Sequence, residues 1–161
     1  MKTLPVIAIV CVVMTLTGAD AKGHLIKRSI HCCGWSEYNG RCFIFIPSSM
    51  TWTSAEKNCQ SLGGNLASVR DVFEYQAIQK LTSNGTSHYP DTWIGGSDGE
   101  EDGVWLWSDG TPFHYSNWYP GEPNNLSGPQ NCLIMNFGAS KGWDDEKCTV
   151  RRSSVCVKKI Q

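Results

Sequence analysis

The sequence predicts an α+β domain in which a hairpin and two helices precede an antiparallel sheet with long loops. Two amphipathic segments occupy residues 52–62 and 68–81. From residue 92 onward, short apolar and aromatic runs alternate with loops rich in Gly, Pro, Asn and Trp. Helices and strands that are segregated along a chain, rather than alternating, are typical of this class.

The first 21 residues have the features of a secretory signal peptide. A basic start at Met1-Lys2 precedes a mostly apolar run over residues 4–16, and Ala19-Asp20-Ala21 provides a cleavage site between small residues. We therefore expect residues 1–21 to be removed and the protein to be extracellular. The apolar run is too short to cross a bilayer comfortably and no later run is longer, so we expect no membrane span.

The rest of the chain fits a single domain. Residues 22–31 carry no periodic pattern and are predicted to be a mobile N-terminal segment, with Lys27-Arg28 as a dibasic processing site. Residues 32–158 are long enough to bury one core. The chain has 14 Lys and Arg against 15 Asp and Glu, a net charge of −1. Because phosphate binding needs a basic surface, nucleic acid is not expected as a partner.

A β-hairpin is predicted near the start of the domain. Apolar and aromatic residues in the ranges 33–37 and 41–45 flank Asn39-Gly40. Asn-Gly favours a tight two-residue turn between antiparallel strands. The sequence therefore predicts two paired strands at this point.

Two helices are predicted next. Thr53 and Glu56 resemble a capping box, and the buried face of the first helix is predicted to contain Trp52, Ala55, Cys59 and Leu62. Gly63-Gly64 ends this helix. The second helix is predicted to start within residues 68–71, with a buried stripe of Phe73, Ala77, Ile78 and Leu81.

Four strands are predicted in the second half, at residues 92–95, 104–107, 132–135 and 154–157. Between the second and the third of them, residues 108–130 show no clear secondary structure. Long loops in compact domains are usually functional or disordered. The flanking Trp118 and Trp143 favour a functional loop here.

Seven cysteines follow the predicted signal peptide: Cys32, Cys33, Cys42, Cys59, Cys132, Cys148 and Cys156. In a secreted chain they indicate a disulfide framework, and the absence of a CxxC pair argues against zinc. Either Cys32 or Cys33 can staple the hairpin through Cys42. Our working assignment pairs Cys33 with Cys42 and leaves Cys32 to link a second chain as a disulfide-bonded oligomer.

Two segments carry the oxygen ligands that Ca²⁺ prefers. The first is Glu122-Pro123-Asn124, and the second is Trp143-Asp144-Asp145. The sequence therefore predicts a calcium site between neighbouring loops. Asn84 and Asn125 each begin an N-glycosylation sequon.

Several motifs together resemble those of the C-type lectin domain family. The resemblance covers residues 32–158 and is strongest to short secreted members, including fish lectins and type II antifreeze proteins. The motifs that carry it are Cys33-Gly34-Trp35, Leu62-Gly63-Gly64-Asn65-Leu66-Ala67-Ser68, Trp93-Ile94-Gly95-Gly96, Glu122-Pro123-Asn124 and Gly142-Trp143-Asp144-Asp145 with Cys148 and Cys156.

The resemblance implies a C-type lectin-like fold and assigns two disulfides, Cys59–Cys156 and Cys132–Cys148. It also implies a cis peptide bond before Pro123. The metal ligands that it implies are Glu122, Asn124, Gln130, Asp144 and Asp145. The sugar contacts that it implies are Glu122, Asn124, Gln130 and Asp144.

In the family, Glu-Pro-Asn accompanies mannose-type sugars. Two positions depart from the family pattern: Gln130 stands where an acidic ligand is usual, and Asp144 stands where Asn is usual. Three carboxylates therefore remain, which favours a retained Ca²⁺, while the donors and acceptors that face the sugar change. At the family's auxiliary calcium site, Asp98 and Asp102 match, but Asn125 and Asn131 replace carboxylates. We expect a second ion to be weak or absent.

The predicted function is calcium-dependent recognition of mannose-type glycans on microbial surfaces, in innate defence. Ice binding on the same scaffold is the first alternative. A protein-binding subunit with structural calcium is the second. We find no Gly-x-Ser-x-Gly motif and no paired His/Cys setting, so we do not expect an enzyme.

Overall fold

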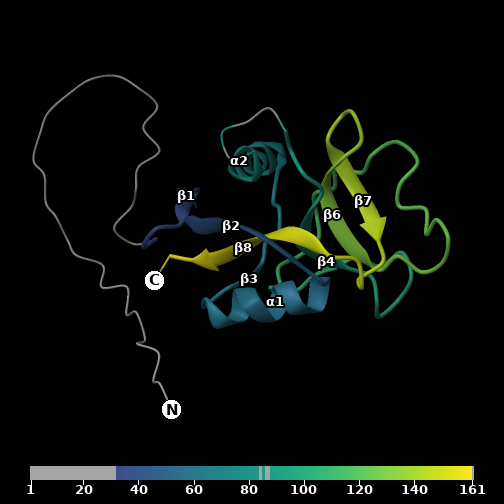
Figure 1. The fold of residues 1–161 in the computed structure, drawn as a ribbon, viewed down its shortest axis with the longest axis horizontal. Helices are drawn as coiled ribbons and strands as arrows, with labels where there is room; N and C mark the ends of the chain where they lie inside the picture. Colours follow the sequence, from purple (N-terminus) through teal and green to yellow (C-terminus); the bar gives the residue numbers. More distant parts are fainter. Residues whose placement is uncertain (1–31, 84, 86–87, 161) are drawn as a thin grey trace, which may run out of the picture.

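The computed structural model describes residues 32–83, 85 and 88–160. The predicted signal peptide (residues 1–21), the predicted mobile segment (residues 22–31) and the sequon at Asn84 lie outside these residues. Figure 1 shows the described elements in chain order: β1 (Ser36–Tyr38), β2 (Arg41–Met50), α1 (Trp52–Ser61), β3 (Asn65–Leu66), α2 (Val72–Thr82), β4 (Thr92–Ser97), β5 (Leu106–Trp107), β6 (Cys132–Phe137), β7 (Gly142–Glu146) and β8 (Arg152–Lys159).

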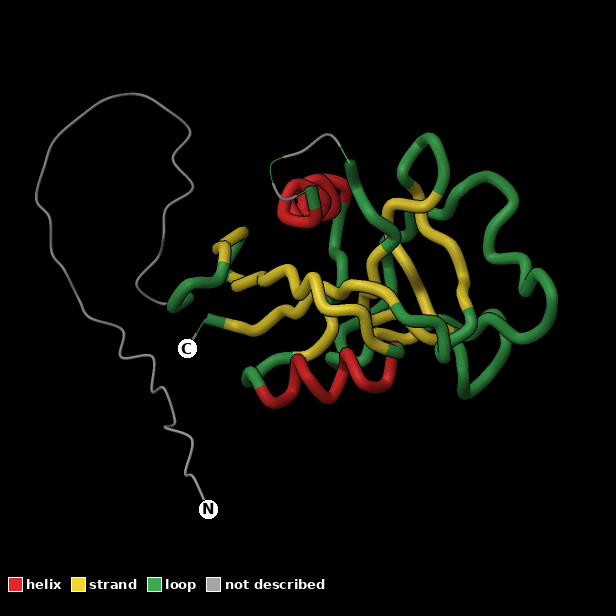
Figure 2. The backbone as a smooth tube through the Cα atoms, viewed as in Figure 1, coloured by secondary structure: helices red, strands yellow, loops and turns green. Residues whose placement is uncertain are grey.

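The strands form one mixed sheet in the order β1-β2-β8-β4-β6-β7, with β3 added to β8 and β5 added to β4. All pairings are antiparallel except that of β4 with β8, in which Thr92 lies beside Ser153 and Trp93 beside Ser154. The α+β class is therefore confirmed, although the sheet is not purely antiparallel. Figure 2 shows α1 and α2 on opposite sides of the β2–β8 ribbon.

Each face of the sheet has its own core. Along β6, Leu133 and Met135 pack with Ile78 of α2, whereas Cys132 and Ile134 pack with Ala55 of α1. Successive side chains of a strand point to opposite faces, so one strand serves both cores. The central strands are consequently apolar on both sides.

The hairpin prediction is confirmed. Tyr38 pairs with Arg41, and the two turn residues between them, Asn39 and Gly40, have φ of 47° and 75°. Asn and Gly tolerate this left-handed backbone better than other residues, which explains the tight turn.

The disulfide assignment of the hairpin was wrong. Cys32, not Cys33, bonds Cys42 at a Cα–Cα distance of 5.5 Å. Cys32 is fully buried beside Trp35 in the core on the α1 side, whereas Cys33 is exposed. Because the sulfur of Cys32 is used within the chain, the predicted oligomer linked through Cys32 does not fit this structure. Cys59–Cys156 and Cys132–Cys148 are confirmed.

Helix α1 begins at Trp52, and its N-cap lies two residues before the predicted Thr53. Its N-cap is Thr51, whose side chain accepts a hydrogen bond from the Ser54 N–H. Glu56 is buried and accepts from Leu66 N at 2.8 Å and from Asn65 Nδ2 at 2.6 Å. This carboxylate therefore fixes the turn between α1 and β3, and it does not cap the helix. Leu62, predicted to be buried, follows the helix and is exposed.

The buried stripe of α2 was only partly predicted. Asp71 caps the helix by accepting from the N–H groups of Phe73 and Glu74. Ile78 is fully buried, but Phe73 is 67% exposed while Glu74 is 1% exposed. The helix turns Glu74 inward because this carboxylate forms an ion pair with Arg41 of β2.

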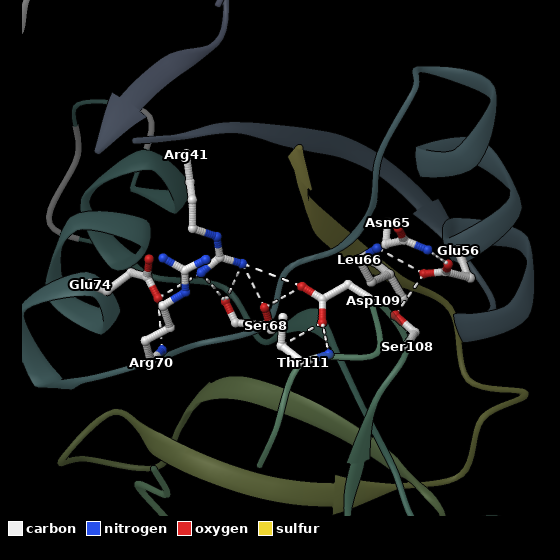
Figure 3. A network of polar contacts seen from close by, with 10 residues as sticks. All are labelled: Arg41, Glu56, Asn65, Leu66, Ser68, Arg70, Glu74, Ser108, Asp109 and Thr111. Carbon is white, nitrogen blue, oxygen red and sulfur yellow. Dashed lines mark hydrogen bonds and ion pairs between the residues drawn. The ribbon is translucent and has the colours of Figure 1, made fainter. Parts of the chain in front are cut away.

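That ion pair is the centre of a buried polar network (Figure 3). Arg41 contacts Glu74 at 2.8 Å and Asp109 at 3.5 Å, and it donates to Ser68 Oγ at 2.6 Å. Glu74 also accepts from the Arg70 N–H at 2.7 Å. The network ties β2, the start of α2 and the turn after β5 together.

Strands β3 and β7 were missed, and β5 contains only Leu106 and Trp107 of the predicted residues 104–107. β3 has two residues, too few for a periodic pattern. β7 contains the Trp143-Asp144-Asp145 motif, and its adjacent aspartates are not the alternating apolar pattern by which a strand is predicted. Within the described chain, neither helix has the length and apolar character needed to cross a membrane.

The Arg41–Glu74 pair gives a stability prediction. In Glu74→Gln the guanidinium of Arg41 loses its nearest negative charge while both side chains stay buried. We expect the free energy of unfolding to fall by about 3 to 5 kcal/mol. Denaturant titration followed by tryptophan fluorescence measures it. The exposed Glu101→Gln is the matched control and should change it by less than about 0.5 kcal/mol. A loss below about 1 kcal/mol in Glu74→Gln would contradict the assigned role of the pair.

Candidate metal and ligand site

The predicted ligands meet where the long loop of residues 108–131 lies against β7. The backbone of Trp143 holds this loop on both sides: Tyr119 N donates to Trp143 O, and Trp143 N donates to Asn117 O, each at 2.8 Å. The Trp143 ring is fully buried and lies edge-on to the Trp118 ring at 5.9 Å. The tryptophan of the motif is thus a core residue that docks the loop.

Three carboxylates converge at this junction. Glu122, Asp144 and Asp145 each offer an oxygen that lies within 4.8 Å of the others. Glu122 comes from the loop, and the two aspartates come from β7. The peptide bond between Glu122 and Pro123 is cis, as predicted. Among the described residues, this is the one group of three His, Cys, Asp or Glu side chains close enough to share a metal ion.

Asp145 connects the strand to the loop. It is fully buried, and its two oxygens accept from Asn124 N at 2.8 Å and from Asn125 N at 2.7 Å. A carboxylate oxygen has a second lone pair, so these bonds leave Asp145 able to bind a cation. The residue therefore has a structural role beyond the metal ligation predicted for it.

The two predicted amide ligands are arranged differently. Gln130 is 9% exposed, and its Oε1 accepts no hydrogen bond within the described part of the chain. Glu122 Oε2 is buried in the same way. By contrast, Asn124 is exposed and its Oδ1 accepts from Leu126 N at 2.7 Å. The amide oxygen of Asn124 thus serves its own loop.

Burial and mutual repulsion alter the protonation of the carboxylates. Burial, followed by the neighbouring Glu122 and Asp145, raises the pKa of Asp144 from 3.8 to about 8. Burial also raises the pKa of Glu122. Three carboxylates this close favour either a bound proton or a cation. A hard divalent ion with oxygen ligands suits this set.

The auxiliary positions are held by amides. Asn131 Nδ2 donates to Asp98 at 3.0 Å, and Asn125 Nδ2 donates to Asp102 at 2.9 Å. Gly103 N donates to the other oxygen of Asp98 at 2.9 Å. Asn125 and Asn131 therefore bring amide donors, and no carboxylate charge, to the auxiliary positions.

Asn125 is a residue whose part in the site was missed. Besides its bond to Asp102, its Oδ1 accepts from Gln130 N at 2.8 Å, so one side chain joins three segments of the loops. In the sequence it was notable as a sequon and as a departure from the auxiliary site. Its backbone φ of 51° could not be predicted from the sequence, which shows only that Asn tolerates this conformation. A glycan on Nδ2 would compete with the Asp102 contact, while its attachment there stays a prediction.

Comparisons with known proteins agree with the fold. Residues 48–158 match the Lectin C-type domain. Ladderlectin of Oncorhynchus mykiss is 43% identical over 115 residues, which cover 71% of this chain and 60% of ladderlectin. The chain thus matches less than two thirds of the ladderlectin length.

A second relative and a solved structure match over most of their own length. The galactose-specific lectin nattectin of Thalassophryne nattereri is 37% identical over 139 residues, 85% of this chain and 87% of nattectin. The solved structure of herring type II antifreeze protein superposes with a TM-score of 0.74. It is 35% identical and covers 79% of this chain and 97% of the herring chain.

The raised pKa of Asp144 gives a pH prediction. A folded pKa of about 8 against 3.8 means that this carboxyl contributes stability below its unfolded pKa and loses it as pH rises through about 8. With a chelator present, we therefore expect this group to lower the thermal midpoint as pH rises from about pH 4 to about pH 8, and to have no further effect above that. Calorimetric scans across this range measure the slope. Asp144→Asn should flatten it, and the exposed Glu100→Gln should not. A midpoint that rises over this range would exclude the assignment.

Proposed function

The chain belongs to the C-type lectin domain family, and we propose that it is a secreted lectin that binds carbohydrate through Ca²⁺. The observation that carries the proposal is the convergence of Glu122, Asp144 and Asp145 within 4.8 Å. The three disulfides and the predicted signal peptide support an extracellular location, where such bonds persist. Calcium is abundant enough there to fill sites of modest affinity.

The proposed ion would be held by the three carboxylates and by Gln130. Glu122 Oε2 and Gln130 Oε1 are buried without hydrogen-bond partners in the described chain, and such oxygens are costly unless something binds them. A cation satisfies both oxygens and offsets the repulsion that raises the pKa of Asp144. Calcium accepts six to eight oxygens in irregular geometry, so further positions would stay open for ligand.

The proposed ligand is a sugar with neighbouring hydroxyls. Hydroxyls that bind a cation through one lone pair still donate a proton and accept one bond. Glu122 and Asp144 accept such protons, while the amides of Asn124 and Gln130 donate. The Glu122-Pro123-Asn124 order supports mannose-type sugars, as on microbial surfaces, and a role in innate defence. Because nattectin is a galactose-specific lectin, galactose is the comparison sugar.

Calcium binding is the first test. We expect one Ca²⁺ to bind per chain and to raise the thermal midpoint, since an ion that binds only the folded state stabilises that state. Glu122→Gln should weaken binding by about 10- to 100-fold or more, because it removes a ligand charge. Isothermal titration calorimetry measures both, with the exposed Glu100→Gln as control. Absence of heat at millimolar calcium would refute the proposal.

Sugar binding is the second test. We expect the protein to be retained on immobilised mannose in calcium and released by a chelator. A parallel galactose column decides the sugar class: stronger retention there would overturn the mannose preference but keep the lectin. Retention on either column that survives the chelator would contradict the metal-dependent mechanism.

Ice binding is a second candidate because the herring type II antifreeze protein has the same fold at 35% identity. The side chain of Leu126 is 70% exposed and is an apolar group that an ice-binding face could use. Thermal hysteresis measured on the purified protein separates this function from the lectin function.

A further inference from the structure

A cavity of about 300 Å³ lies at the end of the domain opposite the carboxylate cluster. The turn after α1 (Gly63–Asn65), Arg70 and the turn after β5 surround it, together with the last residues of β8. In Figure 1 the end of β8 lies beside the C-terminus, while β7, which carries Asp144 and Asp145, lies at the far side of the domain. The two sites are therefore separate.

The lining is strongly basic. It contains Arg41, Arg70, Lys158 and Lys159 and one carboxylate, Asp109. Lys159 pairs with Arg41 across β8 and β2, so these two side chains share one face of the sheet, whereas the side chain of the adjacent Lys158 points to the opposite face. The whole chain has slightly more acidic than basic residues, so this concentration of positive charge is not a property of the average surface. A concave site with one sign of charge raises the local concentration of the opposite ion.

The carboxylates nearby are already used. Asp109 accepts from Ser68 Oγ at 2.5 Å, from Thr111 N at 3.0 Å and from Thr111 Oγ1 at 2.6 Å. Glu74 is taken by Arg41 at 2.8 Å and by the Arg70 N–H. These bonds fix the inner wall and leave it rigid. They also leave the outer cations without an internal counter-charge.

The outer cations are positioned for an external anion. Figure 3 shows the Arg70 side chain extending beside the guanidinium of Arg41. Arg70 and Lys159 are exposed, and their side chains form no ion pair or hydrogen bond within the described chain. Lys158 is held over the Trp35 ring at 4.4 Å. The planar guanidinium of Arg70, with the ammonium of Lys159 in the same lining, suits a tetrahedral oxyanion.

We propose that this cavity is a second ligand site, which binds the sulfate or phosphate ester of an acidic sugar without calcium. Its volume is at the lower end of ligand pockets and fits one charged sugar unit rather than a long chain. The fork of Arg70 would take two oxyanion oxygens, and Lys159 would supply further positive charge. Glycans could then be held at both ends of the domain.

The test is calorimetric titration of the full chain with two probes in the presence of a chelator. One probe is a heparin-derived disaccharide, and the other is mannose 6-phosphate. We expect at least one to bind and the heat to fall as salt rises. The probe that binds more tightly identifies sulfate or phosphate as the ligand source. No heat with either probe would overturn the proposal.

Variants locate the binding. Arg70→Gln and Lys159→Gln should each weaken it about tenfold or more, since each removes a charged hydrogen-bond donor. Both side chains are exposed, so the thermal midpoint should stay unchanged. Lys57→Gln removes an equal charge from an exposed position outside the cavity and should leave binding intact. Equal losses in all three variants, or binding that requires calcium, would assign the anion to another surface. Failure of the carboxylate site to bind calcium would leave this experiment unaffected.

Discussion

The site depends on the hydrogen bonds that the buried carboxylate of Asp145 accepts from the long loop. This residue comes from β7, and it accepts the N–H groups of Asn124 and Asn125 from the long loop. A buried carboxylate that accepts two backbone N–H groups holds these donors firmly. A segment with little regular structure of its own is thereby fixed to the sheet. The position of Glu122 beside Asp144 follows from that attachment.

The loops around the site are organised by amides as well as by carboxylates. Asn125 joins Asp102 to Gln130, and Asn131 holds Asp98. Each amide supplies hydrogens to an acid that would otherwise repel its neighbours. Within the described residues, no amide donates to the side chains of Glu122 and Asp144, and the pKa of both carboxyl groups is raised, chiefly by burial. A cation is therefore needed most at the cluster of Glu122, Asp144 and Asp145.

Charge is distributed so that the two ends of the domain differ. The acidic cluster lies at the long loop, and the basic cavity lies at the far end of β8. Between them, the apolar cores on the two faces of the sheet keep the ends apart. The network of Arg41, Glu74 and Asp109 forms the rigid floor of the basic end. A domain with two charged ends can hold two chemically different groups of one ligand or surface.

Local chemistry in the sequence determined the Asn39-Gly40 turn, the two helices and the residues of the acidic cluster, because turn geometry, periodicity and ligand type are properties of short segments. The family resemblance added the pairing of Cys59 with Cys156 and of Cys132 with Cys148. Tertiary structure alone decided that Cys32 rather than Cys33 is buried, that Glu74 faces inward and Phe73 outward, and that the Asp144–Asp145 segment is a strand. Each of these depends on a partner distant in the chain, such as Arg41 for Glu74 or β6 for β7, and local periodicity carries no information about such a partner.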